Sequence, residues 1–279
     1  MKIKSFFGIF LLFIVFSALS CTDYQEEVTG INDSSLARII VRNELSVGVD
    51  PSIPPLSFYS SSGKIIGYEV DIAQAIADKL GVQLRLEAIS TSDRISELEN
   101  RAIDYIASGF INNEKNAERF SLSTPYLRDA LIVAVFQSAG GEMPFQQLSD
   151  LRNRRIGMLS DQEIVEIVTN SPLYINNGRR NPYLYSRLEK LLTALDYKQL
   201  DAVVMNLLTY YSKITIEKKQ YRAIGDPLVI TTYSYAFRKE DRKLTETINM
   251  FLADMAQDGT LRALSTKLFG VDVSIVGKY

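Results

Sequence analysis

Strand-like and helix-like segments alternate along most of this chain of 279 residues. Residues 45–49 have the apolar, β-branched composition of a strand, and residues 82–88 alternate apolar and polar side chains. Between them, residues 71–80 carry apolar side chains at helical spacing until Gly81, a typical helix stop. A second helix and a third strand are predicted at residues 92–100 and 103–108. This order predicts parallel strands joined by helical crossovers.

A second alternation follows in the other half of the chain. After an apolar, β-rich run at residues 130–136, the pattern predicts the order strand, helix, helix, strand at residues 156–159, 163–169, 187–195 and 202–205. Residues 171–182 are rich in Asn, Arg, Pro and Gly, which predicts a surface loop. The last segments are a strand at 233–238 and helices at 241–258 and 261–269. About 245 residues beyond the N-terminal region exceed the commonest domain size, so we expect two compact lobes.

The N-terminal residues have the pattern of an export signal. Lys2 and Lys4 precede an apolar run at residues 6–19 that is too short to span a bilayer. Ala-Leu-Ser-Cys at residues 18–21 resembles a bacterial lipobox, which predicts lipidation of Cys21, and ordinary soluble secretion is the alternative. Cys21 is the only cysteine, so no internal disulfide is possible. The polar, acidic residues that follow it predict a flexible tether.

The composition excludes several classes of function. A net charge of −2 without a basic run argues against nucleic-acid binding. The chain has no histidine, which excludes Ser-His-Asp and Cys-His catalysis and histidine-ligated metals. A Ser-x-x-Lys match at residues 61–64 lies in a Ser/Gly loop, where that chemistry needs a helix face. We therefore expect no enzyme, no cofactor and no metal site.

Several short motifs together resemble a known family. They are Gly-Tyr-Glu-Val-Asp at residues 67–71, Ser-Thr-Pro-Tyr at 123–126 and Asp-Gly-Thr-Leu at 258–261. Their order and spacing are similar to those of the family 3 solute-binding proteins, the receptors of polar amino-acid transporters, over about residues 36–270. The resemblance implies the bilobal periplasmic-binding-protein fold, with two α/β lobes joined by a two-strand hinge and a ligand between them. The expected divisions are a signal peptide at 1–20, a lipidated tether at 21–35, lobe 1 at 36–131 plus 229–279, and lobe 2 at 132–228.

The same resemblance implies where an amino acid would be held. Family members use a Thr-x-x-Arg turn, a Gly-Thr turn in the second lobe, and an Asp after the Asp-Ala-Val-Val strand. These positions fall at Asn113 and Asn116, at Asp161 and Gln162, and at Asn206. The usual cation and the usual ammonium partner are therefore both replaced, and Lys115 or Arg119 is an alternative source of the cation.

Further ligand-binding candidates lie at the expected strand ends and turns of the first lobe. Each candidate also has a structural interpretation. Asn113, Asn116, Asp161 and Asn206 are also typical helix caps. Asp50 is typical of a turn, and Ile53 and Thr91 of packing. The remaining candidates are Phe58 and Tyr68 as aromatic walls, and Ser108, Gly109 and Phe110.

Two functions are consistent with these features. The first is an exported, lipid-anchored, monomeric receptor, periplasmic or on the cell surface, that binds a small polar ligand for an ABC permease. The second is a sensory or cell-wall-associated module that binds an atypical ligand, such as a peptidoglycan fragment or a protein partner. Residues 118–126 and 258–261 are also similar to the receptor-like half of membrane-bound lytic transglycosylases. Because the sequence ends soon after Gly270, we expect their catalytic half to be absent.

Overall fold

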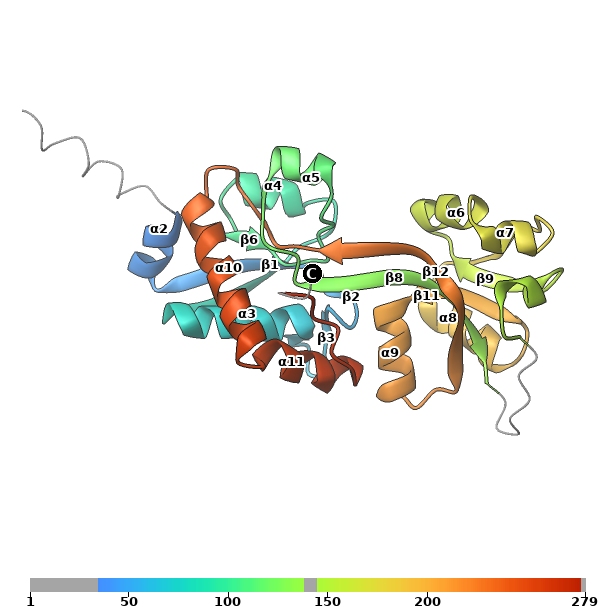
Figure 1. The fold of residues 1–279 in the computed structure, drawn as a ribbon. Coiled ribbons are helices and arrows are strands. Elements are labelled where there is room, and N and C mark those ends of the chain that lie inside the picture. The colour runs from blue at the N-terminus through green and yellow to red at the C-terminus, as the bar shows by residue number, and fades with distance from the viewer. Residues whose placement is uncertain (1–34, 138–144, 277–279) are drawn as a thin grey trace, which may run out of the picture.

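The computed structural model describes residues 35–137 and 145–276. The predicted signal peptide, Cys21 and nearly all of the tether lie outside these residues, so export cleavage and lipidation stay predictions. Two α/β lobes lie side by side and are joined by two long antiparallel strands (Figure 1). Within the part of the chain that is described, no helix is both long and apolar enough to cross a membrane.

The first lobe is built on a five-stranded sheet with the order β5-β1-β6-β13-β7. β5, β1 and β6 are parallel, while β13 is antiparallel to β6 and β7. The strands are β1 (Glu44–Val49), β5 (Gln83–Ala88), β6 (Tyr105–Ile106), β7 (Ser121–Leu122) and β13 (Ala236–Phe237). The helices are α2 (Ser35–Arg42), α3 (Tyr68–Leu80), α4 (Arg94–Glu99), α5 (Glu114–Arg119), α10 (Arg242–Gln257) and α11 (Thr260–Phe269). A small sheet adds β2 (Ser52–Ile53), β3 (Ser57–Tyr59) and β4 (Ile65–Ile66).

The second lobe is built on another five-stranded sheet, with the order β10-β9-β11-β8-β12. Its strands are β8 (Leu127–Phe136), β9 (Ile156–Leu159), β10 (Tyr183–Tyr185), β11 (Ala202–Asn206) and β12 (Tyr221–Tyr233). Its helices are η1 (Leu148–Leu151), α6 (Gln162–Thr169), α7 (Pro172–Asn176), α8 (Leu188–Asp196) and α9 (Leu207–Thr215). β8 and β12 pair antiparallel along their length and extend toward the first lobe, where Leu127 lies opposite Tyr233.

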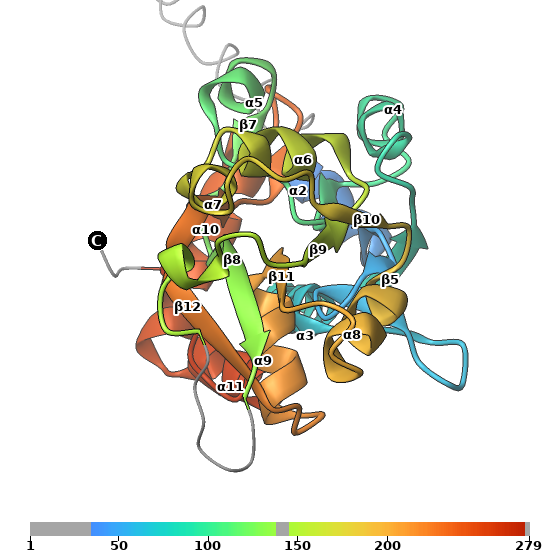
Figure 2. The ribbon, with the colours of Figure 1, turned by 90° about the vertical axis from the view of Figure 1, so that its right-hand side faces the viewer.

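Each lobe has a hydrophobic core, and the two cores meet at α9. In the first lobe α3, α10 and α11 pack on the sheet around Ile72, Ile248 and Phe269, and Leu208 of α9 joins this core from the second lobe. The second sheet is covered on both faces, by α8 and α9 on one side and by α6 and α7 on the other (Figure 2). A movement of the lobes about the two connecting strands would therefore change the contact of Leu208 with the first core.

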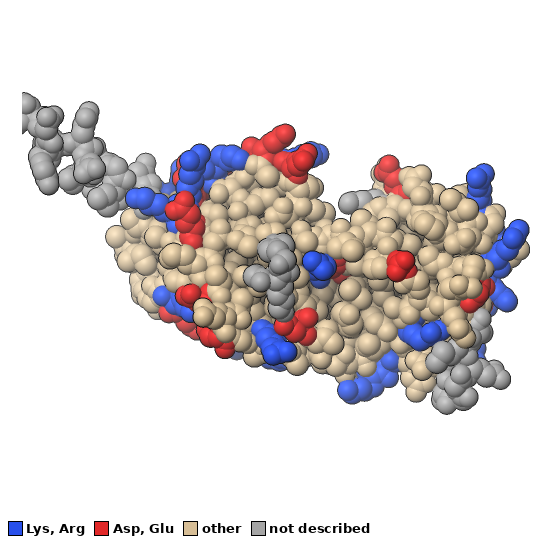
Figure 3. Space-filling model, in the orientation of Figure 1, with Lys and Arg blue, Asp and Glu red and all other residues tan. Residues whose placement is uncertain are grey.

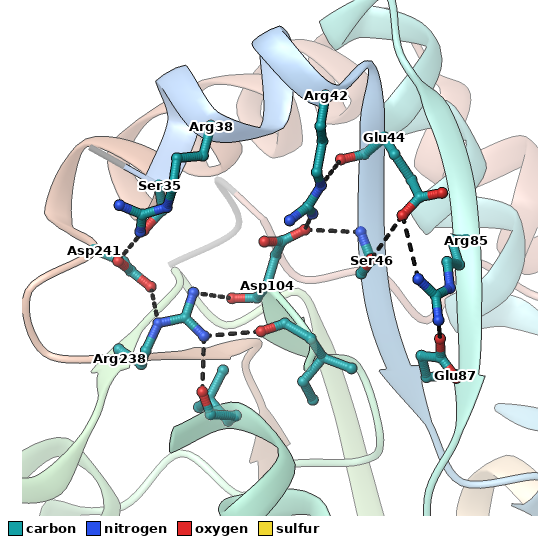
Figure 4. A network of polar contacts seen from close by, with 12 residues as sticks. Ser35, Arg38, Arg42, Glu44, Ser46, Arg85, Glu87, Asp104, Arg238 and Asp241 are labelled. Carbon is teal, nitrogen blue, oxygen red and sulfur yellow. Dashed lines mark hydrogen bonds and ion pairs between the residues drawn. The ribbon is translucent and has the colours of Figure 1, made fainter. Parts of the chain in front are cut away.

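A buried polar network ties the N-terminal helix α2 to the first lobe (Figure 4). The Arg238 guanidinium donates to the carbonyls of Leu98 and Ile103 at 2.7 and 2.8 Å, and its Nε lies 2.7 Å from Asp241 Oδ2. The Ser35 hydroxyl donates to Asp241. Beside them, Arg42 pairs with the buried carboxylate of Asp104. Every buried carboxylate of this network therefore has an arginine partner.

The helix α3 begins at Tyr68, three residues before the predicted start. Its first N–H groups, of Tyr68 and Glu69, donate to the carbonyls of Pro55 and Leu56, which lets the helix start earlier. Gly67 precedes it with φ of +141°, and a Cβ there would lie 2.2 Å from the Leu56 oxygen. The glycine of this motif is thus required by a close backbone approach.

Most predicted elements are present, and three expectations need correction. The chain returns to the first lobe through β12, which ends at Tyr233, and only Ala236–Phe237 of the strand predicted at residues 233–238 forms a strand, β13. The predicted surface loop at 171–182 contains the helix α7, with a proline in its first turn. Residue 35, placed in the tether, begins the packed helix α2. The predicted lobe boundaries themselves stay predictions.

Candidate functional site

A cleft of about 200 Å³ lies at the junction of the two lobes. Its lining comes mainly from the second lobe. Ile111 of the first lobe also lines it and forms an isolated β-bridge with Tyr233 at the end of β12. The polar lining residues are Asp129, Asp161, Asn206, Thr231 and Tyr233. The volume equals roughly seven liquid-water volumes, which suits a small solute. On the face drawn in Figure 3 the surface is hollowed between the lobes, and charges of both signs are scattered around it.

Asp129, on β8, is the buried charged group of this cleft. Its Oδ1 accepts hydrogen bonds from the N–H groups of Ala130 and Leu208, at 2.8 and 3.1 Å. Its Oδ2 accepts from Asn206 Nδ2 at 2.9 Å and from the Tyr233 hydroxyl at 3.3 Å. Burial raises the pKa of Asp129 above its usual value, although these four hydrogen bonds oppose the rise. The sequence analysis missed this residue. The only feature of the sequence that points to it is its position as an acid directly before the apolar residues 130–136.

Asn206 lies in the cleft, as the resemblance implied, but it does not cap the helix that follows. Instead its amide donates to Asp129, and Asp129 accepts the N–H of Leu208 in the first turn of α9. The capping interpretation of Asn206 is therefore wrong, because Asp129 takes the capping role from the neighbouring strand. The resemblance implies an acid at position 206, and in this chain the nearest buried acid is Asp129, on the neighbouring strand β8.

Asp161 lines the cleft and also caps a helix. Its Oδ1 accepts the N–H of Ile164, in the first turn of α6, at 3.1 Å. The predicted capping interpretation is confirmed. Gln162, the next residue, begins α6 and is exposed, and its role in binding stays a prediction.

In the first lobe, the predicted residues Asp50 and Thr91 lie together. The Thr91 hydroxyl donates to Asp50 Oδ2 at 2.8 Å, and Ser52 donates its hydroxyl and its N–H to Oδ1. Burial raises the pKa of Asp50, but the hydrogen bonds from Ser52 and Thr91 outweigh burial and the net pKa is lowered. Asp50 thus forms the turn that the sequence predicted, at the carboxyl end of β1.

Arg94 brings a cation to this part of the first lobe. It begins α4 just beyond β5, and its Nη1 donates to the Ser108 carbonyl at 3.1 Å. Its guanidinium carbon lies 4.8 Å from the centre of the Phe110 ring. Burial lowers the pKa of Arg94, while the carboxylates of Asp50 and Glu69 oppose this. Its Nε is buried and has no hydrogen-bond partner among the described residues.

Glu69 holds the backbone of the predicted binding residue Gly109. Its Oε1 accepts the N–H of Gly109 at 2.8 Å and a hydrogen bond from the Tyr126 hydroxyl. Gly109 has φ of +53°, which favours glycine. Burial raises the pKa of Glu69 to about 7, against the hydrogen bonds from Tyr126 and Gly109 and the charge of Arg94. Glu69 therefore fixes the turn at residues 108–110 from inside the core.

The two asparagines at the position of the family's Thr-x-x-Arg turn support backbone. Asn113 Oδ1 accepts the N–H of Asn116 at 2.8 Å and caps α5, as predicted. Asn116 Nδ2 donates to the carbonyl of Ile111, which lines the cleft, at 2.8 Å. Arg119, one alternative source of the missing cation, lies 2.6 Å from Glu99 Oε1 on the exposed surface. The other, Lys115, is exposed on α5.

Two predicted binding residues lie in the core. Tyr68 is fully buried and packs edge to face against Phe269, with ring centres 5.3 Å apart. The interpretation of Tyr68 as a cleft wall is wrong, since its ring does not reach the surface. Phe110 is buried against Phe120, and its contact with a ligand stays a prediction. Phe58 and Ile53 are half-buried in the small sheet, and their contact with a ligand stays a prediction.

No group of three or more acidic or cysteine side chains that could hold a metal ion occurs in residues 35–137 and 145–276. The larger hollow beside α4 is lined by residues of the first lobe alone, including Arg42, Glu87 and Arg101. The cleft at the junction is the candidate site, since the predicted binding residues Asp161 and Asn206 line it.

Residues 45–271 match the family of bacterial extracellular solute-binding proteins, family 3. The chain belongs to this family. The L-cystine-binding protein TcyJ of Escherichia coli K12 is 25% identical over 245 residues, which cover 87% of this chain and 89% of that protein. The probable amino-acid-binding protein YxeM of Bacillus subtilis is 24% identical and covers 85% of this chain and 88% of its own length.

Solved structures of family 3 proteins have the same fold. Tv2483 bound to L-arginine is 31% identical with a TM-score of 0.65, over 87% of this chain and 97% of that one. The ancestral cationic amino acid solute-binding protein AncCDT-1 is 21% identical with a TM-score of 0.75, over 85% of this chain and the whole of that one. The predicted bilobal periplasmic-binding-protein fold is confirmed, and a family of extracellular receptors implies an exported protein.

Proposed function

We propose that this protein is an exported receptor that captures a small, amino-acid-like solute between its lobes and delivers it to an ABC-type permease. One observation carries the proposal, which is that the cleft lies at the junction of two lobes, each built on its own sheet. Similarity to an L-cystine-binding protein and to a probable amino-acid-binding protein supports the class of solute.

Closure of the lobes would complete the site. The second lobe supplies Asp129 and Asp161, while the first supplies Arg94 and the turn at residues 108–110. β8 and β12 are the two connections, and a change in their twist would bring these groups together while most of each core stays in place. A permease would then recognise the closed form.

The proposal has three further parts. The protein binds its solute without catalysis, it is a monomer, and a lipid on Cys21 holds it to the membrane. The family of receptors to which the chain belongs supports the first point. The lipobox-like sequence before Cys21 supports the last. Mass spectrometry of the protein from its host membrane would show a diacylglycerol adduct on Cys21, and a free N-terminus beyond residue 21 would contradict the anchor.

Calorimetry and thermal-shift assays with the L-amino acids, cystine and small polyamines test the proposal. We expect micromolar or tighter binding of at least one of them, a higher melting temperature, and a smaller radius of gyration in solution scattering. If none of these solutes binds the protein or raises its melting temperature, the proposal that it is a transport receptor is contradicted.

A second candidate function is a sensory or cell-wall-associated binding module. It is favoured by the replacement of the family's clamp at Asn116, Asp161 and Asn206. Purified muropeptides are the decisive probe, because they would bind such a module and not an amino-acid receptor. Genes for a permease and an ATPase beside this one would favour transport.

A further inference from the structure

We propose that the second lobe's side of the cleft selects a ligand with a positively charged side chain, and that Asp129 is the carboxylate that binds that side chain. This inference rests on the proposed function and names the charge of the ligand's side chain. It gives the acid of the second lobe a different position and a different partner from those that the family resemblance implies, which are position 206, Asn206 here, and the ammonium of the amino acid.

The register of the sheet explains how the acid can change strands. β11 is antiparallel to β8, and Asn206 lies opposite Leu131. Asp129 lies two residues from Leu131 and so projects from the same face of the sheet. The two side chains meet, with Asn206 Nδ2 2.9 Å from Asp129 Oδ2. A carboxylate on β8 therefore reaches nearly the same space as a carboxylate at position 206 would.

The hydrogen bonds around Asp129 favour its ionised form. Two backbone N–H groups, one amide and one tyrosine hydroxyl all donate to it, and the carboxylate needs no proton of its own to satisfy them. All four donors are uncharged. The start of α9 adds only a partial positive charge.

No arginine or lysine of the described residues hydrogen-bonds or ion-pairs with Asp129. A buried carboxylate without a cation is costly, and a cationic ligand would supply the missing charge. The raised pKa of Asp129 is consistent with charge that its neutral donors do not fully compensate.

The rest of the cleft narrows the ligand class. Asp161 adds a second carboxyl group to the lining, which contains no lysine or arginine. Ile111, Leu131, Ile164 and Val229 supply apolar surface between the charges. This combination suits an ammonium or guanidinium group on a short aliphatic stem, since methylenes gain from apolar contact while the charged end pairs with a carboxylate. It opposes a ligand with an acidic side chain.

A comparison of two nearly isosteric ligands tests the charge directly. L-arginine carries a guanidinium where L-citrulline carries a neutral urea group, and the two share the α-ammonium and α-carboxylate, so calorimetry of the wild-type protein with both isolates the side-chain charge. We expect L-arginine or L-lysine to bind at least about tenfold more tightly than L-citrulline, L-glutamine and L-glutamate. Equal or tighter binding of the neutral or anionic ligands would overturn the inference and leave the proposed function intact.

The variant Asp129→Asn tests the residue. We expect the affinity for the cationic ligand to fall at least about tenfold, while any affinity for L-citrulline changes by less than about threefold. Asp226→Asn is the matched control, because Asp226 is exposed on β12 outside the cleft lining and its loss changes net charge equally. Equal losses in both variants, or none in Asp129→Asn, would overturn the role of Asp129.

Two further results separate the possible failures. Circular dichroism and the melting temperature establish that Asp129→Asn is folded, and if it is not, the wild-type comparison of L-arginine with L-citrulline decides the inference alone. Absence of binding for every probe, charged or neutral, would contradict the proposed function as well as this inference.

Discussion

Two regions of this protein bury carboxylates in different ways. In the network beside α2, Asp241 and Asp104 are each about 5% exposed and each pairs with an arginine, Arg238 and Arg42 respectively. In the cleft, Asp129 is 3% exposed and all of its partners are neutral donors. Because burial is similar, the difference lies in the counter-charge.

This difference separates a structural role from a binding role. A carboxylate that ties helices together is stable when the protein supplies its cation. A carboxylate that must bind a cationic ligand is held in place by neutral donors and has no cation of the protein beside it. The cost of burying this charge is offset only when the ligand is bound.

Removal of the cation from the structural network has the largest expected effect. Arg238→Met leaves Asp241 without its arginine and frees the carbonyls of Leu98 and Ile103. We expect the free energy of unfolding, measured with denaturant, to fall by about 3 to 5 kcal/mol. Arg101→Met is the matched control, because its ion pair with Glu240 is exposed and is expected to contribute less than about 1 kcal/mol. Similar losses in both variants would break the comparison.

Glu69 gives the next largest effect, and it depends on pH. Burial raises its folded pKa to about 7, above its usual value of 4.5, so its ionisation opposes folding. The favourable contribution of the protonated form is complete below pH 4.5 and is lost as pH rises to about 7, which amounts to roughly 3 kcal/mol. Glu69→Gln should remove this part of the pH dependence in unfolding measurements between pH 4.5 and 8. An unchanged slope in the variant would show that Glu69 titrates normally.

Restoration of the family's acid at position 206 sharpens the account of the cleft. Asn206→Asp places a second carboxylate against Asp129, and two carboxylates in contact cannot both ionise cheaply. We expect a loss of about 2 kcal/mol of stability at pH 8, which is regained as pH falls. The double variant Asp129→Asn with Asn206→Asp moves the charge instead of adding one, and it should recover both stability and cation binding. Failure of this rescue would mean that the two positions are not equivalent.

Tyr233→Phe has the smallest expected effect. The variant removes one neutral donor, 3.3 Å from Asp129 Oδ2, and keeps the ring. We expect the affinity for the cationic ligand to change by less than about tenfold, since a neutral hydrogen bond contributes about 0.5 to 1.5 kcal/mol. Calorimetry measures this change, and a loss as large as that of Asp129→Asn would indicate that Tyr233 contacts the ligand itself.

The sequence predicted the elements whose hydrophobic pattern is strong. The strand Ile156–Leu159 was predicted at its observed bounds, and the helix α10 within one residue at each end, because local periodicity determines both. β12 was missed since its exposed and buried residues follow no simple alternation and Gly225 and Pro227 interrupt it. Its place in the fold depends on pairing with β8, which is a long-range contact.

The candidate site was predicted in part for the same reason. Asp161 and Asn206 follow recognisable strands, and both lie in the cleft. Asp129 and Arg94 gain their meaning from neighbours far away in the chain, Asn206 in one case and Ser108 in the other. The register between β8 and β11 brings the first pair together, and no local pattern encodes that register.

A crystal structure of the protein with its tightest ligand from the calorimetric panel would test the central claim most directly. The account predicts closed lobes and a ligand ammonium or guanidinium nitrogen about 2.7 to 2.9 Å from a carboxylate oxygen of Asp129. A ligand bound in the cleft with no cationic group against Asp129, or one bound elsewhere on the protein, would contradict it.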